Sequence, residues 1–273
     1  QTFRGLLFRM EKLKLGIVIP LKSKAISKCW KVTVNSLIST LRSVYAQDND
    51  SFVVAVAGHE IPQEIEDLFP KLKVVKVDFL PPDRNAPDFN HNKLIQDKNL
   101  KIAFAMSALV NSGVTHWYAL DSDDLLSRNF VSTVLNLVDD KSGAVIDGGY
   151  LLYHDVRRAI PCQEMSQLCG STSVLCDELL DIPTKPTLES IGFIPWARYP
   201  HMQIRNFFEQ EAAAPYIVIG APILGYVLAS GDNISDRWRD NWWKVTKAKI
   251  KPFIKGMKYS PSLLQSFSMN NLK

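Results

Sequence analysis

The sequence is informative first through what it lacks. It has no apolar run long enough to cross a bilayer, no secretory signal at its start and no internal repeat. Its 273 residues include four cysteines, and none of them forms a C-x-x-C pair. We therefore expect a cytoplasmic protein with reduced cysteines, without a zinc site or a disulfide scaffold.

The remaining composition is that of an ordinary globular protein, with 46% hydrophobic and 22% charged residues. The length allows one large α/β domain or two small ones. The net charge of +4 is mildly basic. Such a charge suits a phosphorylated or membrane-bound substrate without requiring one.

The first half of the chain alternates between strand-like and helix-like segments. Short apolar runs predict strands, and apolar residues at helical spacing predict amphipathic helices. The expected strands span residues 13–20, 52–57 and 72–77, and the expected helices span residues 30–45, 62–69 and 93–111. This alternation is typical of a parallel sheet with right-handed crossovers.

A buried strand followed by a carboxylate cluster organises the sequence. Residues 114–120 are mostly β-branched, aromatic or apolar, and Asp121-Ser122-Asp123-Asp124 follow at once. Crowded carboxylates repel one another, and Mg²⁺ or Mn²⁺ would supply a counter-charge through hard oxygen ligands. Ligands of open α/β sheets lie beyond the carboxyl ends of strands, which favours a metal site here. The alternative is a polar turn, with Asp124 or Ser127 capping the next helix.

Beyond Asp155 the alternation stops, and we expect the second half to be irregular. Residues 170–175 fit either a polar loop or a strand facing the site. His201, Arg205 and Glu209 are spaced by four and would share one side of a helix running to about residue 213. Later strand-like segments are residues 216–219 and 225–229.

Together these features resemble a GT-A-fold glycosyltransferase of the family 2 group of nucleotide-sugar transferases. The residues that carry the resemblance are Ile17-Val18-Ile19-Pro20, the helix from Trp30 through Gln47, Lys101, Gly113 and Leu120-Asp121-Ser122-Asp123-Asp124. Weaker similarity to a bacterial subgroup lies in Gly170-Ser171, the stretch around His201 and Gly231-Asp232-Asn233-Ile234-Ser235. The convincing part covers a little under half of the chain.

The resemblance implies an α/β GT-A fold, with a mostly parallel central sheet flanked by helices and an irregular acceptor half. A single catalytic domain would span residues 1–273, with residues 13–155 binding the nucleotide sugar, 156–235 facing the acceptor and 236–273 forming a basic, aromatic tail. The implied activity is transfer of a sugar from a nucleotide-diphosphate sugar to an acceptor hydroxyl, with Mn²⁺ or Mg²⁺. By the same analogy the transfer is inverting and serves bacterial glycan or glycoconjugate synthesis, on a glycan or lipid-linked acceptor.

The resemblance also assigns roles to residues. Asp121, Asp123 and His201 would bind the metal, with Asp123 as its main ligand. The general base would be His201, Glu209 or Glu211, which follow the expected acceptor region. The residues that would bind or border the nucleotide sugar are Pro20, Leu21, Lys22, His59, Glu60, Lys98, Lys101, Asp121 and Ser122.

The sequence departs from the family pattern in two places. The Glu-Asp pair that often supplies the general base is not evident, and His201 stands near where it is expected. The Gln-x-x-Arg-Trp motif of processive members is also absent, since Asp236-Arg237-Trp238 has a different pattern. A polymer synthase is therefore not expected.

Other classes give weaker alternatives. A sugar-nucleotide pyrophosphorylase would need a Gly-rich phosphate loop after the first strand, and Leu21-Lys22-Ser23-Lys24 contains no glycine. A non-catalytic nucleotide- or glycan-binding module stays open, because a fold alone does not imply a function. Nucleic-acid binding through the basic tail is not expected, since no recognised module accompanies it.

The tail from residue 236 mixes aromatic with basic residues and allows two interpretations. It could rest on the inner face of an anionic membrane as a weak peripheral contact. Alternatively, Trp238, Trp242 and Trp243 could pack on the catalytic domain while the lysines face water. Pro252 and Gly256 interrupt any long amphipathic helix, which favours packing.

Overall fold

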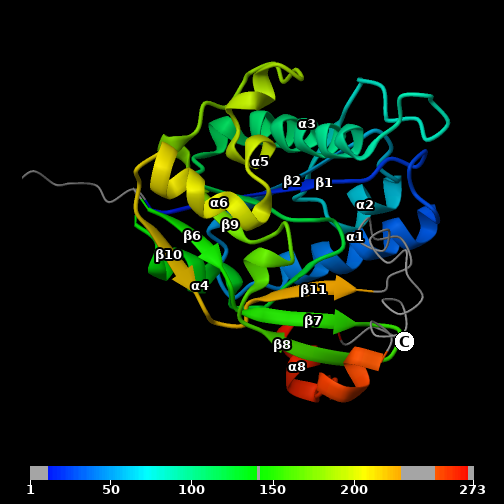
Figure 1. Cartoon of the computed structure of the whole chain (residues 1–273), viewed down its shortest axis with the longest axis vertical. Coiled ribbons are helices and arrows are strands. Elements are labelled where there is room, and N and C mark those ends of the chain that lie inside the picture. Colours follow the sequence, from blue (N-terminus) through cyan, green and yellow to red (C-terminus); the bar gives the residue numbers. More distant parts are fainter. Residues whose placement is uncertain (1–11, 140–141, 229–249, 270–273) are drawn as a thin grey trace, which may run out of the picture.

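A computed structural model describes residues 12–139, 142–228 and 250–269. This part of the chain forms two β-sheets with helices packed around them (Figure 1). The expected fold class, mixed α/β with a mostly parallel central sheet flanked by helices, is confirmed. Residues 231–235 and the three tail tryptophans, which entered the expectations above, lie outside the described residues.

The larger sheet has seven strands in the order β10-β6-β9-β4-β1-β2-β3. Its strands are β1 (Leu15–Pro20), β2 (Phe52–Gly58), β3 (Lys73–Lys76), β4 (His116–Ala119), β6 (Gly143–Ile146), β9 (Ser173–Cys176) and β10 (Tyr216–Ile219). Neighbours run parallel, except that β9 pairs antiparallel with both β4 and β6. β4 is central, and every residue in β4 and β1 is buried, as expected for strands covered on two faces.

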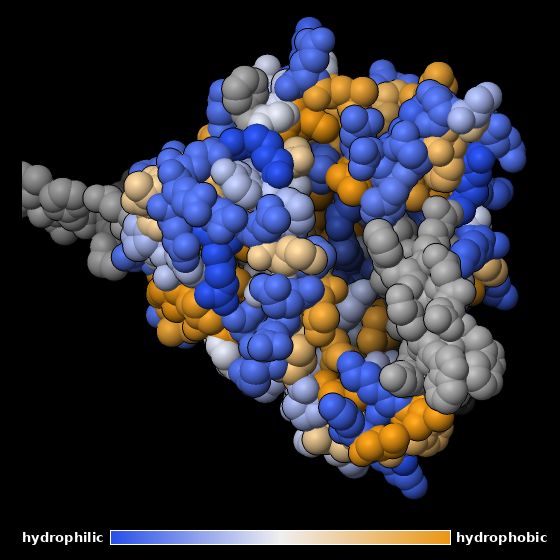
Figure 2. Space-filling model, in the orientation of Figure 1, coloured by the Kyte–Doolittle hydropathy of each residue, from blue (hydrophilic) through white to orange (hydrophobic). Residues whose placement is uncertain are grey.

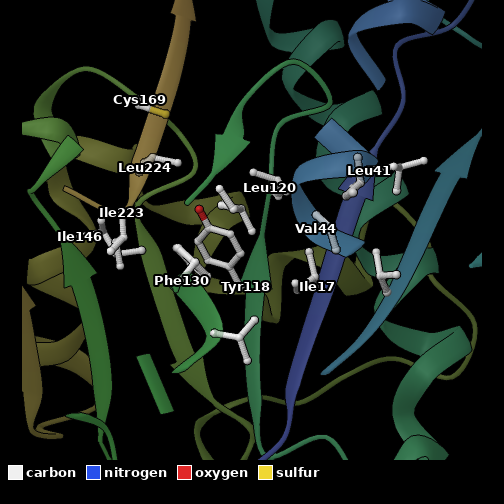
Figure 3. Close-up of a cluster of buried hydrophobic side chains, with 14 of the residues drawn as sticks. Ile17, Leu41, Val44, Tyr118, Leu120, Phe130, Ile146, Cys169, Ile223 and Leu224 are labelled. Atoms are coloured by element: carbon white, nitrogen blue, oxygen red, sulfur yellow. The ribbon is translucent and has the colours of Figure 1, made fainter. Parts of the chain in front are cut away.

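Helices cover both faces of this sheet. The longer ones are α1 (Trp30–Tyr45), α2 (Gln63–Leu68), α3 (His91–Leu109) and α4 (Phe130–Leu137), and shorter ones are α5 (Pro195–Arg198) and α6 (Ile204–Asn206). α3 packs against one face, where Val18 and Trp117 are buried. Ile17 points to the opposite face and lies near Val44 of α1 (Figure 3). Alternate residues of β1 thus meet different helices, which is the period of a strand.

The smaller sheet has five strands in the order β12-β8-β7-β11-β5. They are β5 (Leu125–Leu126), β7 (Gly149–Tyr153), β8 (Arg158–Cys162), β11 (Leu224–Leu228) and β12 (Met257–Lys258), and α8 (Pro261–Ser266) packs on them. Leu263, Phe267 and Met269 are buried there with Leu152 and Val227. The later strands expected at residues 216–219 and 225–229 correspond to β10 and β11, and further short strands of the second half complete both sheets.

The expected boundaries of helices and strands agree with the structure in the first half of the chain and differ at two later helix starts. The expected elements of the first half agree with the structure to within two residues at either end. Ser127 as a helix cap is wrong, because α4 begins at Phe130 with Asn129 at its N-cap. The Ser127 N–H instead donates to the carbonyl of Ile223 (2.9 Å), which ties this residue to the approach of β11. The single helix expected from His201 is a succession of turns of different pitch through Glu211.

Membrane-spanning helices were not expected. Within residues 12–139, 142–228 and 250–269, no helix combines the length and apolar composition needed to cross a bilayer.

Gly148, between β6 and β7, makes a close backbone crossing that a side chain would disrupt. A Cβ at this position would stand 2.1 Å from the carbonyl oxygen of Gly220 and 2.3 Å from that of Ala221. We expect Gly148→Ala to destabilise the fold by about 2–3 kcal/mol, lowering the Tm by about 5–10 °C in a thermal melt. Gly192→Ala is the matched control, since a Cβ there meets nothing within 4 Å. If the two variants had the same Tm, the close backbone approach at Gly148 would not be a constraint on the fold.

Candidate active site

The carboxylate cluster follows the central strand, as expected. The N–H of Leu120 still donates to the carbonyl of Val18 in β1 (3.0 Å), and the chain then turns away at Asp121. The N–H of Asp124 donates to the carbonyl of Asp121 (3.1 Å), which closes this acidic turn, residues 121–124. Since β1 runs parallel to β4, the turn lies beside the carboxyl end of β1, where α/β sheets bind ligands.

Asp124 anchors the acidic turn to the rest of the protein. It is fully buried, and its Oδ2 accepts from the Ser171 hydroxyl (2.7 Å) and the Cys169 thiol (3.1 Å). The Ser171 hydroxyl oxygen in turn accepts from the N–H of Asp121 (2.9 Å). Burial, and then the charges of Asp123 and Asp121, raise the pKa of Asp124 well above its usual range. Asp124 is therefore a positioning residue, not a surface ligand.

Asp121 and Asp123 are the half-buried carboxylates of the turn. Burial, and then the charge of Asp121, raise the pKa of Asp123 to about 6, while Lys22 and Lys98 act in the opposite direction. Asp121 forms an ion pair with Lys98. The two carboxylates thus repel each other, and the charges of Lys22 and Lys98 offset part of this repulsion.

α3 brings Lys98 to the acidic turn. Burial lowers the pKa of Lys98, but the Asp121 carboxylate outweighs this effect, so the pKa is raised. A Cβ on Gly170 would stand 3.1 Å from Asp121 Oδ2 and 3.2 Å from Lys98 Nζ, so the backbone at this residue lies directly against the ion pair.

His201 lies in the same neighbourhood. Burial, and then the charge of Lys98, lower its pKa, whereas a hydrogen bond to the backbone of Gln167 and the charge of Asp121 oppose this effect. Segments far apart in the sequence, from α3, β4 and residue 201, therefore meet at the acidic turn. Hydrophilic surface lines a hollow between α3 and β11 on the face in view (Figure 2). This is the region in which α3 supplies Lys98 and β11 donates a backbone N–H to Asp124 (3.4 Å).

A second charged cluster lies one turn further along α3. Lys101 is fully buried, with its Nζ 2.7 Å from Oδ2 of Asp97. His59, after β2, has its Nε2 2.9 Å from the carbonyl oxygen of Phe79 and 3.9 Å from Oδ1 of Asp97. Burial is the main cause of the lowered pKa of both Lys101 and His59. Because Lys101 is wholly covered, it acts on its surroundings through Asp97.

The remaining residues expected to border a nucleotide lie near these two clusters. Leu21 is buried and its N–H donates to the carbonyl of Ala57 (2.8 Å), which carries the chain from Pro20 past the end of β2. Glu60 is exposed and accepts from the N–H of Lys24 (3.1 Å). Ser122 is half-buried within the acidic turn.

The two glutamates considered as bases are engaged elsewhere. Glu209 accepts a hydrogen bond from the Tyr216 hydroxyl (2.5 Å). Glu211 forms a bidentate pair with Arg198 (2.6 Å for each bond) and accepts from the Tyr199 hydroxyl (2.7 Å). The bond from Arg198, followed by that from Tyr199, lowers the pKa of Glu211, which makes it a weaker proton acceptor.

Sequence reasoning missed one ion pair close to this region. Arg205 contacts Asp147 (2.5 Å), which directly follows β6. The Ser166 hydroxyl also donates to Asp147 (2.5 Å). The sequence signal that could have identified Asp147 is the same as for the acidic turn: a carboxylate directly after a strand of a parallel sheet.

The donor set of the acidic turn fits a hard divalent cation with few protein ligands. Among the described residues, no group of three or more His, Cys, Asp or Glu side chains could hold a metal. Mg²⁺ is commonly bound by one or two carboxylates, with water and substrate phosphates completing its shell. Asp121 and Asp123 meet this need, and their mutual repulsion is what a cation would relieve.

No protein-family model matches this chain, and no curated protein sequence matches it. Similar solved structures include TarS of S. aureus, at 14% identity and a TM-score of 0.46 over 80% of this chain and 37% of that one. Rv0371c of Mycobacterium tuberculosis H37Rv is 11% identical, with a TM-score of 0.40 over 87% of this chain and 98% of that one. A structure of Rv0371c in complex with manganese is 12% identical, with a TM-score of 0.40 over 83% and 97%.

A further similar structure is that of a protein from Desulfovibrio desulfuricans G20, named as a proposed nucleotide-diphospho-sugar transferase. It is 9% identical, with a TM-score of 0.42 over 89% of this chain and 98% of that one. The present chain spans 37% of TarS. At these values the similarities identify no family.

The repulsion within the acidic turn predicts a stabilising substitution. A carboxyl whose pKa is raised on folding contributes stability that is present below its unfolded pKa of 3.8 and lost as pH rises through about 6. In metal-free buffer at pH 7.5, Asp123→Asn is therefore expected to stabilise the fold by about 1–3 kcal/mol. The gain should shrink as pH falls to 4.5, where wild type is protonated too. A lower Tm for the variant at pH 7.5 would refute this account.

Proposed function

We propose that the chain transfers a sugar from a nucleotide-diphosphate sugar to an acceptor hydroxyl with the help of Mn²⁺ or Mg²⁺. The observation that carries this proposal is the acidic turn at the end of β4, where Asp121 pairs with Lys98 and the charges of Lys22 and Lys98 lower the pKa of Asp123. Carboxylates suit the metal and ammonium groups suit diphosphate oxygens, so the set fits a metal-bound diphosphate.

Each residue of the turn has a distinct task in this proposal. Asp121 and Asp123 would hold the cation, and a bound cation would supply positive charge for the leaving diphosphate. Lys98 exchanges part of its contact with Asp121 for a phosphate oxygen, and Lys22 approaches from the β1 side. Asp124 keeps both ligands in place through Ser171. The repulsion stored in the free turn makes cation binding more favourable.

The nucleoside is proposed to lie over the ends of β1 and β2. Pro20, Leu21 and Lys22 border it on one side, and His59 and Glu60 on the other. Lys101 contributes by orienting Asp97 next to His59. Ser122 offers its backbone and hydroxyl at the junction with the diphosphate.

His201 is the favoured general base. The charges of Lys98 and Asp121 act on its pKa, whereas Glu211 is paired with Arg198 and Glu209 accepts a hydrogen bond from Tyr216. Its lowered pKa keeps the imidazole neutral near pH 7, and a neutral imidazole can take the acceptor proton. By analogy with family 2, the transfer is inverting and non-processive, on a glycan or lipid-linked acceptor in bacterial glycan synthesis.

The first test is nucleotide release from a panel of UDP-, GDP-, CDP- and dTDP-sugars with Mn²⁺. Asp123→Ala should abolish turnover, as should excess chelator. Lys98→Met should lower kcat/KM about 100-fold, because a charged contact to the leaving group is lost. Lys93→Met is the matched control, since Lys93 lies on the same helix and pairs with the exposed Asp88. Equal losses at Lys93 and Lys98, or full activity of Asp123→Ala, would refute the proposal. Nucleotide binding without any turnover would favour a non-catalytic module.

A second test separates two roles for His201. If it is the base, His201→Ala lowers kcat by about 100-fold or more and leaves Mn²⁺ affinity unchanged. Wild-type kcat should then fall as pH drops through the lowered His201 pKa, below 6.5, because the protonated imidazole cannot accept. Glu211→Gln is the control and should keep its activity. If His201→Ala weakens Mn²⁺ binding instead, His201 is a metal ligand.

A further inference from the structure

Residues 250–258 carry several exposed apolar side chains within the part of the chain that the structure describes. The exposed fractions of Ile250, Phe253, Ile254 and Met257 are 46%, 56%, 75% and 49%. Residues 250–255 are helical, and β12 follows. Apolar surface appears at the lower edge of the molecule (Figure 2), over the segment coloured orange-red in Figure 1. We call residues 250–258 the apolar C-terminal face.

This face is held in place by bonds that do not bury it. β12 pairs antiparallel with β8, and the N–H of Tyr259 donates to the carbonyl of Arg157 (3.0 Å). The Arg158 guanidinium donates to the carbonyl of Gly256 (2.7 Å) and lies 5.1 Å from the centre of the Phe253 ring. The apolar side chains are therefore presented on an ordered backbone, which lowers the entropy cost of binding through them.

The charged side chains within the face, residues 250–258, are all positive. Lys251, Lys255 and Lys258 are exposed and alternate with its apolar side chains. The sequence contains no Asp or Glu after Asp240, so the segment offers no internal counter-charge. In the adjoining turn between β7 and β8, exposed Asp155 and Arg157 carry opposite charges.

We propose that the apolar C-terminal face docks on an anionic phospholipid surface. Interfacial segments bury apolar side chains at the level of the headgroups while lysines meet anionic phosphates. A second copy of this chain fits less well, since a two-fold contact would set the lysines of one face against those of the other. The proposal is independent of the transfer reaction, although it would bring the protein to a lipid-linked acceptor.

Co-sedimentation of the 273-residue chain with vesicles tests this docking directly. We expect binding to phosphatidylglycerol–phosphatidylcholine vesicles at 20 mM salt, weakened at 500 mM, and no binding to pure phosphatidylcholine. Lys251→Gln with Lys255→Gln should lower the partition coefficient about tenfold or more, since each surface lysine is worth roughly fivefold. Ile254→Ser with Met257→Ser should lower the partition coefficient by a similar factor. It should also abolish the vesicle binding that remains at 500 mM salt.

The matched control is Lys185→Gln with Leu188→Ser, which removes an exposed lysine and an exposed leucine elsewhere. It should bind like wild type, and circular dichroism should show every variant folded. No binding to anionic vesicles at low salt, or equal losses in the control, overturns the proposal. A self-association in sedimentation velocity that Ile254→Ser with Met257→Ser abolishes would overturn it in favour of a second copy. Because binding is read without turnover, an inactive protein that still binds vesicles contradicts only the transferase proposal.

Discussion

The hydrogen bond between Asp124 and Ser171 is the contact on which the candidate site depends. It joins the end of β4 to the segment before β9, which runs antiparallel beside it. Because the Ser171 hydroxyl also accepts from the N–H of Asp121, one serine fixes both ends of the acidic turn. Asp124 is buried without a basic partner at bonding distance among the described residues, and burial followed by the charges of Asp123 and Asp121 raises its pKa.

The charges of the acidic turn are linked as closely as its hydrogen bonds. The charges of Asp123 and Asp121 raise the pKa of Asp124, and the charge of Asp121 raises that of Asp123. Lys98, which pairs with Asp121, and Lys22 offset part of this repulsion at Asp123. Asp124 therefore affects both the position and the electrostatics of the turn.

The sequence predicts where the candidate site lies, but it does not predict which side chains contact one another there. The apolar β4 followed by carboxylates identifies the turn, because buried strands and their exits have a local signature. It does not distinguish Lys98 from Lys101, which stand three positions apart on α3 and point to different neighbours. Which neighbours each lysine meets depends on how α3 is rotated about its axis against the sheet. That rotation is set by long-range packing and not by local sequence. β8 was missed because Pro161 and Arg158 weaken its strand pattern, and its pairing with β12 spans almost a hundred residues.

Part of the tail packs on the fold, while the three tryptophans of the packing interpretation lie outside the described residues. Residues 263–269 pack into the smaller sheet, where Phe267 and Met269 share a buried cluster with Val227. The backbone of Val227 in turn donates to Asp124 (3.4 Å), and the N–H of Arg128 donates to the carbonyl of Ser266 (2.8 Å). The C-terminal helix thus supports β11, and β11 supports the residue that fixes the acidic turn. Among the described residues of the tail, Ile250, Phe253, Ile254 and Met257 instead leave much of their apolar side chains exposed.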